Sequence, residues 1–162
     1  MSTVQRAQIQ PHLQRILAEE AQLLAELEAL LHQETQILQG DDLAAIHNIG
    51  AARHHCVDRL TRLDGERSDL CRMLSFGSGT GALKKLFTWA DPDSALRGQW
   101  QSNLERARRC KDLNDRNGAI VTVKLGRVQQ LLGKLRGTQA PSVYGPKAGR
   151  YARLDARNLG RA

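Results

Sequence analysis

Aromatic residues are scarce in this chain of 162 residues, which holds two Phe, two Trp and two Tyr, or 4% in all. A core must therefore be built mainly from Leu, Ile, Val and Ala. That composition favours helices packed on helices over a sandwich or barrel, whose strands need alternating β-branched and aromatic residues. The length of the chain suits one domain.

The chain also has few cysteines and lacks a long apolar run. Cys56, Cys71 and Cys110 are an odd number without the spacing of a disulfide framework, and each falls at or beside an apolar stripe. No apolar segment approaches the roughly 20 residues that a helix needs to cross a bilayer. Residues 1–10 are polar, unlike the apolar core of a signal peptide. We therefore expect the protein in the cytoplasm.

Apolar pairs recur every seven residues near the start of the chain. The pairs are Ile16-Leu17, Leu23-Leu24, Leu30-Leu31 and Ile37-Leu38. Seven residues make about two turns of helix, so all eight side chains lie on one stripe of a long helix. We expect that helix over residues 4–39, ended by Gly40. Glu20 and Glu34 interrupt the stripe, and we expect them to set the register or to pair with basic residues of the third long helix.

A second long helix follows almost at once, because Asp41 or Asp42 can cap it and its apolar stripe continues to Leu74. So short a link forces an antiparallel hairpin. A glycine-rich loop and a short helix over residues 82–89 come next. The predicted fold is thus all-α, an elongated antiparallel bundle of three long helices plus one short helix.

The third long helix is expected over residues 93–136, with a cap from the segment Asp91-Pro92-Asp93-Ser94 before it. It is longer than the hairpin, so it either overhangs or bends near residues 114–118, its weakest helical stretch. Asn114 and Asn117 fall on its apolar seam. Buried polar residues cost stability, so replacing both with Leu is expected to raise the melting temperature if they face the bundle.

Charge is distributed unevenly along the chain, whose formal net charge is +7. The first helix is acidic and the third is basic, which favours their packing side by side. From Gly137 the apolar pattern ends. Residues 137–162 combine Pro and Gly with Arg and carry a net charge of +4. We expect a bundle domain over residues 1–136 and a flexible, basic C-terminal tail over 137–162.

Two motifs resemble sites without meeting their requirements. His47, His54, His55 and Cys56 lack the spacing of zinc ligands, and we interpret them as a solvated His pair beside a core Cys. The glycine-rich segment 77–81 lacks the Gly-Lys-Ser/Thr order of a phosphate-binding loop, so we expect a connector. No set of residues suggests a nucleophile and its base. We expect no enzyme activity, no metal and no cofactor.

A basic cluster on the third helix leaves another function open. Arg106, Arg108, Arg109 and Lys111 could hold phosphates of a nucleic acid. They lie around the helix with acidic residues between them, however, as on a solvated face. A structural coiled-coil adaptor is a further alternative.

The order of these parts, together with three short motifs, resembles the FlgN family of flagellar synthesis proteins. The motifs are Leu113-Asn114-Asp115-Arg116-Asn117-Gly118, Val128-Gln129-Gln130-Leu131-Leu132 and Tyr144-Gly145-Pro146. The resemblance implies a cytoplasmic export chaperone that binds the C-terminal segments of the hook–filament junction proteins FlgK and FlgL. It also implies delivery of these clients to the flagellar type III export apparatus, with the export gate FlhA as a partner and Tyr144 as the contact. Tyr144 folding back onto the bundle is the alternative.

The apolar stripe after Gly118 is the candidate client-binding surface, because a groove between long helices can shelter an amphipathic helix. Its residues are Ile120, Val121, Leu125, Val128, Leu131, Leu132 and Leu135. The alternative is that the bundle itself buries this stripe, as three-helix bundles commonly do.

Overall fold

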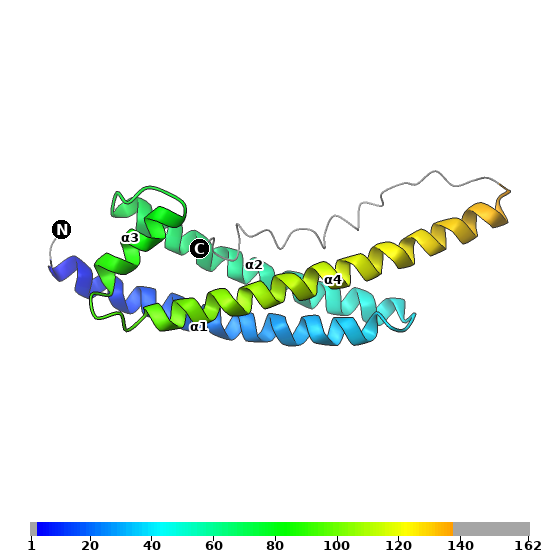
Figure 1. Ribbon diagram of the computed structural model, residues 1–162, viewed down its shortest axis with the longest axis horizontal. Coiled ribbons are helices and arrows are strands. Elements are labelled where there is room, and N and C mark those ends of the chain that lie inside the picture. Colours follow the sequence, from blue (N-terminus) through cyan, green and yellow to red (C-terminus); the bar gives the residue numbers. More distant parts are fainter. Residues whose placement is uncertain (1–2, 138–162) are drawn as a thin grey trace.

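The computed structural model describes residues 3–137, which form four helices and, within that range, no strand (Figure 1). The helices are α1 (Thr3–Ile37), α2 (Leu43–Met73), α3 (Thr80–Ala90) and α4 (Arg97–Leu135). Three of them are long and lie along one axis, so the predicted elongated all-α bundle is confirmed. The predicted tail lies outside the described residues. Within residues 3–137, no helix combines the length and hydropathy that a membrane span requires.

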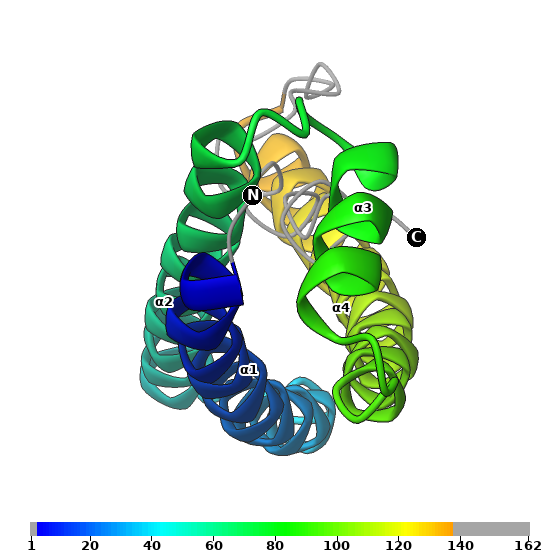
Figure 2. The same ribbon diagram turned by 90° about the vertical axis from the view of Figure 1, so that its left-hand side faces the viewer.

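α1 and α2 form the expected antiparallel hairpin. Asp42 is the residue that caps α2, since its Oδ1 accepts a hydrogen bond from the N–H of Ala45 at 3.0 Å. The heptad leucines of α1 form the centre of the core. Its fully buried members are Leu13, Ile16, Leu17, Leu23, Leu24, Leu27 and Leu31. α1 packs against both α2 and α4, and is therefore the central helix of the bundle (Figure 2).

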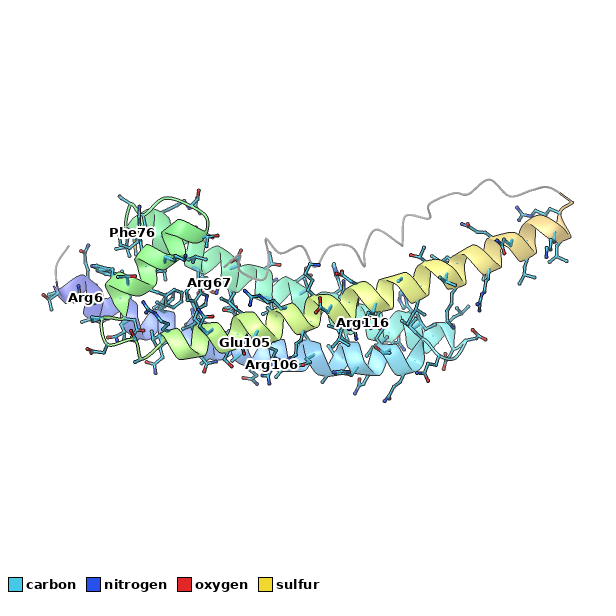
Figure 3. All side chains as sticks on the ribbon, viewed as in Figure 1. Arg6, Arg67, Phe76, Glu105, Arg106 and Arg116 are labelled. Atoms are coloured by element: carbon cyan, nitrogen blue, oxygen red, sulfur yellow. The ribbon has the colours of Figure 1, made fainter. Side chains whose placement is uncertain are left out.

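α3 covers the end of the bundle that holds the N-terminus of α1 (Figure 2). Phe87 of α3 stacks on Trp100 of α4, with ring centroids 4.4 Å apart. Arg6 of α1 lies over the ring of Trp89, 5.7 Å from its centroid, and Phe76 meets the same ring edge-on (Figure 3). The few aromatic residues of the described part are thus concentrated where the short helix meets the long ones.

Asp91 starts α4. Its Oδ2 accepts hydrogen bonds from the N–H groups of Leu96 and Arg97, at 2.9 and 3.1 Å. These N–H groups lie at the helix N-terminus, where they have no partner within the helix, so the carboxylate satisfies them. The capping role predicted for the segment after α3 is confirmed and belongs to Asp91.

α4 is 39 residues long and continues as one helix through residues 114–118. It runs past the turn that joins α1 to α2 (Figure 1). Of the two possibilities that its length left open, the structure therefore has the overhang.

Candidate binding surface on the overhanging helix

α4 is held against α1 by side chains that donate hydrogen bonds to backbone carbonyl oxygens of α1. The donor–acceptor pairs are Asn103–Leu17, Cys110–Leu24 and Asn117–Leu31, at 3.0, 3.7 and 3.0 Å. Each pair is separated by 86 residues along the chain. Donors and acceptors both advance by one heptad per step, so α1 and α4 run parallel with a fixed register.

This register ends where α1 ends. The same offset of 86 places Ile37, the last residue of α1, beside Val123 of α4. Lys124 marks the place, because its Nζ donates to the carbonyl oxygen of Gly40 at 2.6 Å and lies 3.1 Å from Oδ1 of Asp41. Beyond Lys124, α4 has lost the helix that covers its apolar seam.

We call residues 125–135 the overhang. Along the predicted stripe, exposure rises as the hairpin is left behind: Ile120, Val121 and Leu125 are half-buried. The other four are exposed, with fractions of 52% for Val128, 60% for Leu131, 44% for Leu132 and 83% for Leu135. Figure 3 shows this segment extending beyond the turn that joins α1 to α2. The bundle therefore buries only the beginning of the stripe and leaves the rest as an apolar surface.

A model of the family described as FlgN protein matches residues 10–152 of the chain. The chain belongs to this family. The match includes the whole overhang and extends to Tyr144, which lies outside the described residues. Membership of the family gives the protein a role connected with the flagellum. No curated protein and no solved structure matches the chain.

The buried glutamates of this FlgN-family chain pair with basic residues, but not with those expected. An oxygen of Glu20 lies 2.8 Å from Arg67, and one of Glu34 lies 3.2 Å from Arg53. Both arginines belong to α2, so the prediction of partners on the third long helix was wrong. Burial raises the pKa of Glu20, and the nearby Arg67 opposes that shift. Both pairs join α1 to α2, the two helices of the hairpin, and neither involves a residue of the overhang.

The histidines near Cys56 do not form a metal site in the part of the chain that the structure describes. His47, His54 and His55 are exposed, whereas Cys56 is buried and its Sγ donates to the carbonyl oxygen of Leu23 at 3.2 Å. Within residues 3–137, no group of three or more His, Cys, Asp and Glu could hold a metal ion. Burial raises the pKa of the Cys56 thiol to about 11, so it stays a neutral donor between α2 and α1.

The basic cluster of α4 is largely occupied by ion pairs. Arg106 and Arg109 both contact the carboxylate of Glu28 on α1, each at 3.0 Å. Lys111 pairs with Asp115 one turn further along, at 2.8 Å. Arg106 and Arg109 therefore reinforce the α1–α4 contact and Lys111 is paired within α4, so these three side chains do not form a free phosphate-binding patch.

Two residues just before the overhang were not predicted to matter. Val123 is exposed at 55% but lies off the stripe. Lys124 fixes α4 to the hairpin turn through the contacts described above. Nothing in the sequence around Lys124 distinguishes it from other lysines, because its partners at Gly40 and Asp41 are set by the three-dimensional register alone.

Proposed function

We propose that this protein is a cytoplasmic export chaperone that binds the C-terminal segments of the hook–filament junction proteins FlgK and FlgL. It then delivers these clients to the flagellar type III export apparatus. The family match supports a flagellar role. One structural observation supports the client site: the seam that α1 covers as far as Asn117 continues across the overhang, where no other helix of residues 3–137 covers it.

The overhang suits such a client physically. A segment that forms coiled coils with its neighbours in the assembled flagellum has an apolar stripe that must be kept from pairing too early. An amphipathic helix can pack on Val128, Leu132 and Leu135 in the way that α1 packs on the preceding part of α4. The client would then continue the bundle beyond the hairpin turn. This role is one of binding and requires neither a catalytic residue nor a cofactor.

The second part of the proposal concerns delivery of the client. We take the export gate FlhA as the second partner and Tyr144 as its contact. A client on the overhang and a gate contact about ten residues beyond α4 would lie close together along the chain. Release of the client and docking at the gate would then involve neighbouring parts of one molecule.

The client site is tested by replacing apolar side chains without adding charge. The variant Val128→Ser with Leu132→Ser removes two exposed residues of the stripe. Its control, Val123→Ser with Met73→Ser, removes two residues that are also exposed, at 55% and 65%, but lie off it. Isothermal titration with the C-terminal segments of FlgK and FlgL measures the Kd, and circular dichroism measures helicity.

We expect the stripe variant to bind more than about tenfold more weakly at unchanged helicity, because partial burial of two such side chains contributes roughly 2 kcal/mol. The control should bind as the parent chain does. Undiminished binding by the stripe variant, or an equal loss in the control, would show that the overhang is not the client site.

A further inference from the structure

We propose that the segment held by the overhang is an acidic amphipathic helix, with carboxylates beside its apolar seam. This inference rests on the proposed function of the overhang as a helix-docking surface and adds the chemical class of helix that it accepts. The observations that carry it are the sign and the placement of the charges on α4.

The end of α4 carries charge of one sign only. Residues 119–137 contain Lys124, Arg127, Lys134 and Arg136 and no acidic residue. Lys124 already contacts the hairpin turn, because its Nζ donates a hydrogen bond to the carbonyl oxygen of Gly40. The remaining three are exposed. An occupant of the overhang therefore meets three cations that form no ion pair with any residue of 3–137.

These cations lie beside the stripe and not behind it. Successive residues of a helix are about 100° apart. Arg127 therefore lies about 40° from Leu131 at one edge of the stripe, and Arg136 lies about 20° from Leu125 at the other edge. Lys134 lies about 60° from Leu131, between that edge and the opposite face. The face opposite the stripe is uncharged over residues 119–137. Its residues are Ala119, Thr122, Val123, Gly126, Gln130 and Gly133. A helix adapted only to water would carry its charges on that opposite face, whereas charges that flank a seam select the partner helix.

The covered part of α4 shows what these positions do when a helix is present. Arg106 pairs with Glu28 of α1 at 3.0 Å. Arg127 and Lys134 follow Arg106 by three and four heptads, so they occupy the same helical position. A helix that continues the place of α1 along the overhang would therefore put its own Glu28-like carboxylates against Arg127 and Lys134.

Charge disfavours two other occupants. The overhang of a second copy would bring the same three cations against Arg127, Lys134 and Arg136, with like charges opposed. Residues 138–162 of the chain itself hold five basic residues against Asp155, so they meet the same repulsion. A foreign helix with acidic edges has no such penalty and gains from every flanking cation.

The test uses the full chain and two synthetic helical peptides of about three heptads. Both have the same Leu and Val seam, and they differ only in having Glu or Lys beside it. Fluorescence anisotropy gives both Kd values at low and at moderate salt. The overhang variant is Arg127→Glu, Lys134→Glu and Arg136→Glu. The control is Arg62→Glu, Lys84→Glu and Lys85→Glu, three exposed residues of α2 and α3 with the same total change of charge.

We expect the Glu peptide to bind about tenfold more tightly than the Lys peptide at low salt, since three exposed ion pairs each contribute modestly and are screened by salt. The overhang variant should reverse this preference, and the control should retain it. The inference is overturned if the two peptides bind equally, if the overhang variant keeps the preference, or if neither peptide binds. It is also overturned if the chain binds phosphatidylglycerol vesicles through the overhang cations and binds neither peptide.

The same titrations separate this inference from the function beneath it. If both peptides bind the parent chain equally and the Val128→Ser and Leu132→Ser variant binds neither, the overhang docks a helix but has no charge preference. Absence of any effect of that variant on peptides and on junction-protein segments alike would remove the docking surface itself.

Discussion

Asn117 of α4 and Glu34 of α1 meet inside the bundle, where Nδ2 of Asn117 donates to Oε1 of Glu34 at 2.9 Å and both side chains are fully buried. The other oxygen of Glu34 accepts from Nε of Arg53 on α2 at 3.2 Å. Thr35 donates to Oδ1 of Asn117 at 2.7 Å. One buried carboxylate therefore connects all three long helices, close to the point where α1 ends and the overhang begins.

Replacing Asn117 with Leu should destabilise the bundle. When a buried carboxylate loses a hydrogen-bond donor, its desolvation is no longer offset. We therefore expect the free energy of unfolding to fall by about 1–3 kcal/mol. From the sequence alone, replacing both Asn114 and Asn117 with Leu was expected to raise the melting temperature if they faced the bundle, because the hydrogen bond to Glu34 could not be predicted. Urea unfolding followed by circular dichroism measures the change.

Asn48→Leu is the matched control, since Asn48 is an exposed residue of α2 and its replacement should change stability by less than about 0.5 kcal/mol. A higher stability of Asn117→Leu would show that Glu34 is satisfied without the amide.

Glu28 should make the α1–α4 contact sensitive to acid. The guanidinium of Arg109 donates a hydrogen bond to Glu28 and, with its charge and that of Arg106, holds the pKa of this carboxyl below its usual value. An acid whose pKa is lowered by folding adds stability above its unfolded pKa, and that stability is lost as the pH falls through the folded pKa. Glu28→Gln should therefore be less stable than the parent chain near neutral pH, and the difference should vanish in strong acid.

Urea unfolding of both chains across the pH range measures this difference. Glu105→Gln serves as the control, because it removes one carboxylate from the exposed surface of α4 and leaves Arg106 and Arg109 in place. A stability difference for Glu28→Gln that stayed constant into strong acid would mean that the two ion pairs do not stabilise the fold.

The helices and their caps could be predicted because their causes are local. Heptad spacing marks α1, and the carboxylates of Asp42 and Asp91 act on N–H groups only a few residues away. The partners of Glu20 and Glu34 could not be assigned in this way, because they depend on the register of the hairpin. A signal was nonetheless present: Arg53 and Arg67 are separated by two heptads, as the two glutamates are.

The continuity of α4 through residues 114–118 and the exposure of its C-terminal part have different causes. The polar segment 114–118 has weak helical propensity, but hydrogen bonds from Asn117 to Leu31 and Glu34 hold it against α1. The apolar stripe has the same period before and after Lys124, so periodicity alone does not distinguish the covered part from the overhang. Exposure of Val128 and Leu135 follows from where α1 ends, which is a comparison between helices and not a property of α4.

The proposed contact with the export gate can be tested apart from the client site. A chain that ends at Gly137 retains every residue of α1 to α4. It should keep its helicity, its melting temperature and its binding of FlgK and FlgL segments, but lose binding to the cytoplasmic domain of FlhA and lose export in cells. Tyr144→Ala in the full chain should reproduce part of that loss, because an aromatic anchor contributes strongly to an interface. Tyr151→Ala is the matched control, since Tyr151 is the other tyrosine of the chain. Normal export by the shortened chain would show that residues 138–162 are not the delivery signal, and equal losses for the two tyrosines would show that Tyr144 has no special place in it.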